Sequence, residues 1–263
     1  MAKIAGSECV LDVLVNCKTY PAVSTKYLET VCTRGISRDG SFIRLYPVPF
    51  RFLEEKEQYN RWDVIRVRAH RDTKDTRLES WHLDVGAPID VIDSVNSERH
   101  RWEWMHRGVF ESAASMESMG RTNGLVEIIP EELYWEPEEK TWSPGQLALF
   151  KHGNLFHDES KMRSLSERVP WQFKLRLIEK NTGQKFDQKV LAWSYYQGFR
   201  NNFRENNDAQ AALAEVRDRV HRSILDPQKA VFAIFGTHSR FKHWMISALY
   251  HVPRSICAES RLF

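Results

Sequence analysis

The sequence predicts an α+β protein. Its first half should be a β-rich sheet or small barrel with flanking helices, and its second half should contain a further hairpin. Three observations favour this class: a β-branched apolar run at residues 10–17, a turn signal between two strand-like segments, and helical spacing after Ser97. With 263 residues and 42% hydrophobic content, the chain can bury one large core or two smaller ones.

Several short strands are expected in the first half. They cover residues 10–17, 30–36, 42–48, 64–69 and 87–92. The Asp39-Gly40 pair lies between the second and third of these segments, so they should form a hairpin. Apolar and basic residues alternate in the fourth segment, which predicts that Arg66 and Arg68 share one face.

Two helices are also expected. Ser97 can cap a helix that stops at Gly120, and Asn207 or Asp208 can cap a second helix that Pro227 closes. The apolar stripe of the first helix consists of Trp102, Met105, Val109 and Ala113. The stripe of the second consists of Leu213, Val216, Val220 and Ile224. Both stripes predict faces packed against a core.

The second half carries its own strand pattern. Residues 173–177 and 186–193 flank the turn Asn181-Thr182-Gly183, and two final strands are expected at 230–236 and 244–252. A stretch rich in glutamate and proline, residues 130–143, is the candidate boundary or edge loop. It divides the chain into a β-rich domain at 1–129 and an α+β half at 144–263, with a single domain as the alternative.

Composition excludes several classes of protein. The apolar runs are shorter than the roughly 20 residues that cross a bilayer, and no signal-peptide core is found, so we expect a cytoplasmic protein. The four cysteines have neither zinc-site spacing nor the density of a disulfide framework, so we expect no metal and no cofactor. A net charge of +3 does not by itself indicate a nucleic-acid partner.

Motifs of common enzyme classes are not found. The chain has no phosphate-binding glycine loop, zinc-protease helix, nucleophile elbow or dinucleotide fingerprint. The segment Asp187-Gln188-Lys189 lacks the second carboxylate of a nuclease site, and His152-Gly153-Asn154 with His157 is interpreted as turn chemistry. Whether the protein is an enzyme is left open by its sequence.

The segment from Lys18 to Arg51, KTYPAVSTKYLETVCTRGISRDGSFIRLYPVPFR, is the candidate binding surface. Basic residues concentrate nearby, since residues 34–77 hold 11 Lys and Arg against 7 Asp and Glu. Cations bind phosphate, and tyrosines can stack on bases or form hydrogen bonds through their hydroxyls. The candidate ligand-binding residues are Lys18, Arg44 and Arg51 for phosphate and Tyr20, Tyr27 and Tyr46 for the base.

A purely structural interpretation of this segment is also open. Tyr20 and Tyr46 could close barrel corners, and Glu29 could form an ion pair with Arg44. Cys32 is interpreted as a small buried apolar residue.

The pattern KTYP-x-x-S-x-KY-x-ETVC followed by RLYP-x-x-FR resembles an uncharacterised protein family of bacterial genomes and mobile elements. The resemblance continues through VPWQFKLRL, FGT and WMISALYHVP. It implies no activity, but it favours work on nucleic acid or in phage defence. The expected architecture is also similar to the small PUA and ASCH barrels, which read RNA or modified bases.

Three functions remain. The first is binding of RNA, DNA or a nucleotide through the Lys, Arg and Tyr residues named above. The second is an enzyme acting on the same ligands, with Glu29 as general base and Lys18 as electrostatic stabiliser. The third is a protein-interaction subunit that exposes Trp102, Trp104 and Trp135 to a protein partner.

Overall fold

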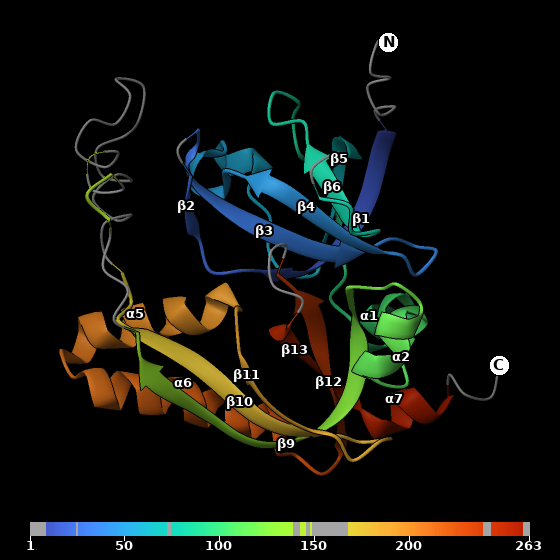
Figure 1. The fold of residues 1–263 in the computed structure, drawn as a ribbon, viewed down its shortest axis with the longest axis vertical. Helices are drawn as coiled ribbons and strands as arrows, with labels where there is room; N and C mark the ends of the chain where they lie inside the picture. Colours follow the sequence, from blue (N-terminus) through green and yellow to red (C-terminus); the bar gives the residue numbers. More distant parts are fainter. Residues whose placement is uncertain are drawn as a thin grey trace.

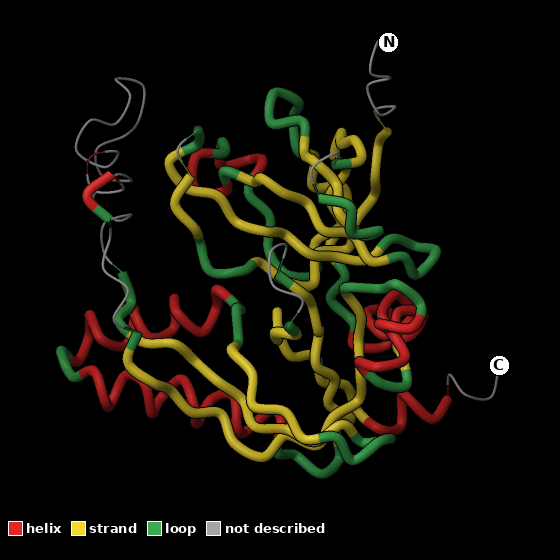
Figure 2. The backbone as a smooth tube through the Cα atoms, in the orientation of Figure 1, coloured by secondary structure: helices red, strands yellow, loops and turns green. Residues whose placement is uncertain are grey.

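The chain is α+β and is built around two β-sheets, which lie one above the other in Figure 1. The computed structural model describes residues 9–24, 26–72, 75–138, 143–145, 148, 168–238 and 243–259. Helices lie on the outside of the lower sheet and beside it, as the tube in Figure 2 shows. No helix in these residues is long and apolar enough to cross a membrane.

The upper sheet closes into a barrel, with strands in the order β1-β3-β4-β6-β5 and β5 pairing back to β1. Only the β4–β6 pair is parallel among these barrel pairings. Its strands are β1 (Cys9–Lys18), β3 (Leu28–Ile36), β4 (Phe42–Val48), β5 (Asp63–Arg71) and β6 (Ser80–Leu83). Two short strands extend it, β2 (Ala22–Ser24) beside β3 and β7 (Asp90–Ser94) beside β5.

Most predicted strands of the first half are confirmed. The hairpin of β3 and β4 pairs Ile36 with Phe42, and Gly40 has a φ of +87°, which a glycine adopts without strain. The predicted strand at 87–92 begins later, at Asp90. The four-residue strand β6 was not predicted.

Alternation along the strands gives the barrel its core. Val13 and Val15 of β1 face inward and pack with apolar side chains of the other strands. Their partners include Ile43, Leu45, Ile65 and Val67. Each such fully buried side chain contributes roughly 1.5–3 kcal/mol. Residues between the inward positions therefore point away from the barrel.

The lower sheet has the order β11-β10-β9-β12-β13, with β8 beside β9. Its strands are β8 (Val109–Phe110), β9 (Asn123–Pro137), β10 (Trp171–Glu179), β11 (Lys185–Lys189), β12 (Lys229–Thr237) and β13 (Trp244–Pro253). Two helices follow β11, α5 (Trp193–Asn206) and α6 (Ala209–Ile224). The predicted hairpin around Gly183 and the two final strands are confirmed, and Asp208 caps α6 through hydrogen bonds from Gln210 N and Ala211 N.

The expected loop at 130–143 is wrong over its first part, because β9 continues to Pro137. Pro130 stands opposite Leu177, where the pairing of β9 with β10 shifts register. A proline is tolerated at such an irregularity because fewer ladder hydrogen bonds are required there. The proposed division therefore starts inside a strand, and the division into domains stays a prediction.

One helix prediction is corrected, and two helices were not predicted. The helix capped by Ser97 ends early as α1 (Glu98–Met105), and the turn η3 (His106–Gly108), β8 and α2 (Ala113–Ser118) replace its continuation. Gly108 packs against Phe42 so closely that a Cβ would lie 2.4 Å from the Phe42 ring, and the next two residues pair with β9. The sequence also missed α5, which begins at Trp193, and α7 (Arg254–Glu259).

The barrel and the lower sheet touch through backbone and side-chain contacts. Thr19 forms an isolated bridge with Ala192, and the Tyr20 N–H donates to Leu191 O at 2.7 Å. The Cys17 thiol donates to Ser247 O at 3.0 Å. The outer face of β1, β3 and β4 is therefore partly covered by the second half of the chain.

Candidate functional site

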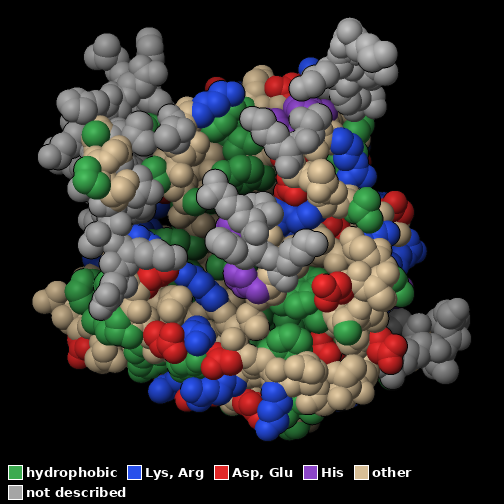
Figure 3. Space-filling model, in the orientation of Figure 1, with side chains coloured by type: hydrophobic (Ala, Val, Ile, Leu, Met, Phe, Trp, Pro, Cys, Tyr) green, Lys and Arg blue, Asp and Glu red, His purple; other side chains and the backbone are tan. Residues whose placement is uncertain are grey.

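A pocket of about 760 Å³ opens where the barrel meets the lower sheet. The barrel contributes the outer faces of β3 and β4, β6, and the loops before β3 and before β6. The lower sheet contributes Thr237, His238 and Met245. Figure 3 shows this face of the molecule, where histidine and basic side chains gather between the two layers. The pocket is thus shared by both halves of the fold.

Two arginines, Arg34 and Arg44, lie side by side in the pocket because they are direct partners in the β3–β4 hairpin. Each is only 3% exposed. Arg34 Nη1 donates to Asn123 Oδ1 at 3.0 Å. Arg44 donates from Nη1 to Ser80 Oγ at 3.3 Å and from Nη2 to Thr122 O at 3.5 Å. All these acceptors are neutral.

The charge of this pair is only weakly compensated among the described residues. The Ser80 hydroxyl accepts a hydrogen bond from Arg44 and donates one to Asp75, so Asp75 is linked to Arg44 through Ser80. The ion pair of Asp75 is with Arg77. Burial works to raise the pKa of Asp75, but hydrogen bonds from Arg77 and Ser80 outweigh it and lower that pKa to about 2. Burial, with the nearby Arg34 charge, lowers the pKa of Arg44 to about 9. Each of the two buried guanidinium groups also has an Nε without a hydrogen-bond partner in the described chain. The floor of the pocket therefore favours an anion.

Aromatic side chains form the walls. Tyr46 is 44% exposed, and its hydroxyl accepts a hydrogen bond from Thr30 Oγ1 at 3.3 Å. His70 and His82 face each other across β5 and β6, with ring centroids 5.0 Å apart. The remaining aromatic lining residues are Tyr20, Tyr27 and Trp81. Flat rings around a cationic floor suit a ligand that carries both a planar group and an anion.

Gly236 of β12 is the position against which Arg34 rests. A Cβ at Gly236 would lie 1.7 Å from Arg34 Nη1 and 2.6 Å from Arg34 Cζ. No side chain fits there unless Arg34 moves. Because Gly236 has no side chain, β12 leaves room for the Arg34 guanidinium group to pack directly against its backbone.

The structure brings four of the predicted site residues to this pocket: Tyr20, Tyr27, Arg44 and Tyr46. Cys32, half-buried, also lines it. The predicted convergence of Lys18 and Arg51 on the same rim is not found, and the candidate base Glu29 is absent from the lining as well.

Lys18 and Arg51 instead lie near the ring of Trp193, at 5.8 Å and 5.7 Å from its centre. The Lys18 ammonium donates to Tyr59 O at 2.6 Å and lies 3.6 Å from the centre of the Phe50 ring. Burial lowers the pKa of Lys18 to about 8. A bulge in β1 between Val15 and Cys17 reverses the alternation, which turns Lys18 inward.

Glu29 forms its ion pair with Arg51, at 3.0 Å, and not with Arg44. It alternates with Thr30, so the two side chains leave β3 on opposite faces. Thr30 lines the pocket, whereas Glu29 is buried behind the strand.

Replacing Glu29 with glutamine should remove a pH dependence of stability. Burial raises the pKa of Glu29 from 4.5 to about 7, against the opposing charges of Arg51 and Arg200. A raised carboxyl pKa means that stability is lost as pH rises from about 4.5 through 7. Across that window wild type should lose about 3 kcal/mol relative to Glu29→Gln, measured by urea unfolding at several pH values. A constant difference between the two proteins would contradict this assignment.

Several lining residues were missed by sequence reasoning. Arg34 could have been found, because the predicted hairpin register places it opposite Arg44. The lining residues of the 70–82 segment, His70, Asp72, Asp75, Arg77, Ser80, Trp81 and His82, carry no motif that distinguishes them from surface residues. Asn123 and Gly236, which contact Arg34 without lining the pocket, are far away in sequence and carry no motif that points to this contact.

Other candidates have structural roles or lie elsewhere. Trp102 and Trp104 are each only 7% exposed, so the proposed tryptophan contact face is wrong for these two residues. Trp135 is half-buried. Asp187 accepts a hydrogen bond from Tyr134 on the surface. The segment 152–157 lies outside the described residues. Among the residues that the structure describes, no cluster of three metal-binding side chains is found.

Two domain families match the sequence. A domain of unknown function (DUF8758) matches residues 10–109, and a second domain of unknown function (DUF8757) matches residues 106–263, which is more than half of the chain. The chain belongs to the DUF8757 family. No curated protein matches it. The pocket is lined by Arg34 and Arg44 from the DUF8758 range and by Thr237, His238 and Met245 from the DUF8757 range, so both ranges contribute to it.

Proposed function

We propose that this protein binds a nucleotide, free or within a single strand of RNA or DNA, in the pocket between its two sheets. Arg34 and Arg44 hold a phosphate group, and the surrounding tyrosines and Trp81 stack against the base. The observation that carries the proposal is the pair of adjacent, buried arginines, whose side-chain hydrogen bonds within the described part of the chain go to neutral groups.

The energetics of the pair support a ligand role. Two neighbouring buried guanidinium groups repel each other and have lost hydration, which disfavours the folded protein. A bound phosphate would supply counter-charge and acceptors for the unpartnered Nε atoms of both residues. The two arginines therefore destabilise the protein when the pocket is empty, and a bound phosphate would remove much of that destabilisation.

The barrel topology supports the same ligand position. Strand order 1-2-3-5-4, with closure of the fourth strand on the first, is that of a five-stranded Greek-key OB barrel. OB barrels bind oligonucleotides across their second and third strands and between the loops that join strands 1–2 and 4–5. In this chain those parts are β3, β4 and the described residues of the segments at 19–27 and 72–79, which together make most of the lining. Similarity to PUA and ASCH barrels stays a prediction, and this strand order favours the OB arrangement.

The alternative functions have less support. An enzyme that uses Glu29 as its base would act elsewhere, because Glu29 does not line the pocket. The setting in mobile elements or phage defence also stays a prediction.

Binding of a labelled single-stranded oligonucleotide of about ten nucleotides, as RNA and as DNA, tests the proposal. Arg44→Met should raise Kd by about 10–100-fold, the scale of one lost charge-assisted hydrogen bond pair. The matched control is Arg66→Met, because Arg66 lies on the outside of the same barrel in a surface pair with Asp12. Absence of binding by wild type at low salt, or an equal loss in both variants, would reject the pocket as the binding site.

A further inference from the structure

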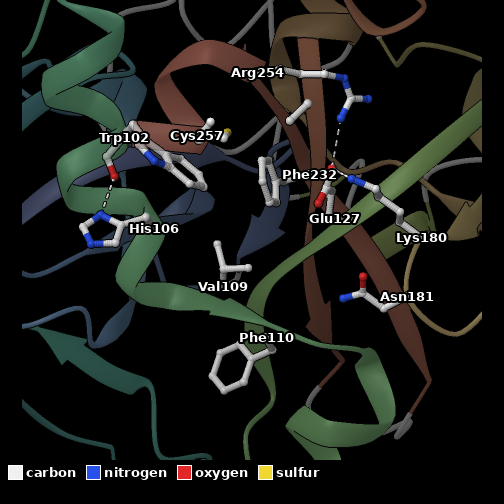
Figure 4. Close-up of a pocket in the computed structure, with 12 residues that line it drawn as sticks. Trp102, His106, Val109, Phe110, Glu127, Lys180, Asn181, Phe232, Arg254 and Cys257 are labelled. Carbon is white, nitrogen blue, oxygen red and sulfur yellow. Dashed lines mark hydrogen bonds and ion pairs between the residues drawn. The ribbon is translucent and has the colours of Figure 1, made fainter. Parts of the chain in front are cut away.

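A second pocket, of about 410 Å³, lies beside the lower sheet, and Figure 4 shows its lining. It has no lining residue in common with the pocket between the sheets. Its lining comes from α1, η3, β8, β9 and β12, from α7, and from the turn after β10. It is built almost entirely from the DUF8757 range.

One side of this second pocket is aromatic. Trp102 and Phe232 have ring centroids 5.2 Å apart, and Figure 4 shows both rings directed toward the same space, above Val109. Tyr250 stacks on Trp102 at 6.2 Å. Phe110 is half-buried at the opposite end of the lining. Trp102 and Phe232 are only 7% and 3% exposed, so they are held by the core and present only their edges and part of their faces to the pocket, as a fixed apolar wall for a flat group.

The other side is charged and is organised around Glu127, a carboxylate that is 7% exposed on β9. Lys180 Nζ lies 2.5 Å and Arg254 Nη1 lies 3.4 Å from its Oε1 atom. Figure 4 shows the two cations converging on Glu127, Arg254 from above and Lys180 from the right.

Both cations are held in place but keep donors for a ligand. Arg254 Nε donates to Pro227 O at 3.1 Å, and the backbone N–H of Lys180 donates to Glu127 O at 3.1 Å. The ammonium and guanidinium groups are partly exposed, and together they carry one more charge than Glu127 neutralises. Lysine has three donors and arginine five, so one shared carboxylate does not satisfy them.

From this geometry we infer that the second pocket binds a nucleoside monophosphate. The base lies against Trp102 and Phe232, and the phosphate lies between Lys180 and Arg254. Asn181 Nδ2 donates to Glu111 O at 3.2 Å, which leaves Oδ1 of Asn181 to accept a hydrogen bond from the ligand. The volume is within the range of roughly 300–1,000 Å³ that is typical of small-molecule sites. This inference does not depend on the pocket between the sheets.

Isothermal titration calorimetry with AMP, GMP, CMP and UMP tests it, with adenosine and inorganic phosphate as partial ligands. At least one nucleotide should bind more tightly than either fragment. The double variant Lys180→Gln/Arg254→Gln should weaken that binding by about tenfold or more. Ala258→Trp should also reduce it, since Ala258 is exposed on α7 and a larger side chain would fill the cavity without removing a charge.

Arg44→Met separates the two sites. The second site is supported if Arg44→Met still binds the nucleotide with unchanged affinity and Ala258→Trp does not. It is overturned if all nucleotide binding is lost in Arg44→Met, or if Ala258→Trp, with a wild-type circular dichroism spectrum, binds as wild type does. Failure of the oligonucleotide to bind would reject the pocket between the sheets as a single-strand site without affecting this result.

Discussion

Arg44→Met should make the unliganded protein more stable while it weakens oligonucleotide binding. Arg44 is buried beside Arg34, and burial together with that like charge lowers its pKa to about 9. Methionine has a similar length and no charge, so it fills the space without the desolvation cost. We expect a gain of about 1–3 kcal/mol in the free energy of unfolding, measured by urea titration at pH 7 without ligand.

The control for this gain is again Arg66→Met, whose arginine is exposed and paired with Asp12 and which should not gain in this way. A protein that keeps a destabilising residue at one position commonly does so for binding or catalysis. If Arg44→Met were instead strongly destabilised, the arginine would be a structural element whose bonds to Ser80 and Thr122 outweigh its desolvation. The ligand interpretation of the pair would then be wrong.

Gly236→Val should destabilise the protein and also abolish binding in the pocket between the sheets. The new Cβ would lie 1.7 Å from Arg34 Nη1, so Arg34 must leave its bond to Asn123 or β12 must shift. Forcing extra atoms into a packed site costs about 1–3 kcal/mol. Urea unfolding and oligonucleotide binding measure the two effects separately.

A second substitution identifies the cause. Arg34→Ala in the Gly236→Val background removes the colliding side chain, so stability should recover in part while binding stays lost. Gly86→Val is the matched control, because a Cβ at Gly86 meets only Asp84 Oδ1 at an ordinary 3.5 Å. If Gly236→Val binds the oligonucleotide as tightly as wild type, Arg34 has no part in the site.

Contact between the two halves gives the pocket between the sheets its position. The barrel alone would leave Arg34 and Arg44 on an outer face in contact with water. Thr122, Asn123 and Gly236 of the second half cover that face and limit the solvent around both cations. In the less polar surroundings, the attraction of a phosphate for the pair is stronger than on an open surface.

Local pattern determined much of this protein by itself. The Asp39-Gly40 turn and the flanking alternation were enough to predict the β3–β4 hairpin and to place Arg44 and Tyr46 on one face. In the second half, Asp208 and the apolar stripe after it predicted α6. These features depend on neighbours within a few residues, so the sequence contains all of their causes.

Tertiary structure decided which residues share the pocket. The bulge in β1 turns Lys18 into the barrel end, and the turn after β4 brings Arg51 to Glu29, so these predicted residues do not line the pocket between the sheets. Pairing of β6 with β4 supplies the residues near 80, and β12 supplies Gly236. A bulge, a parallel pairing and a sheet-to-sheet contact each depend on segments that are distant in sequence. Their energies are set by the packed fold as a whole, and no local pattern encodes them.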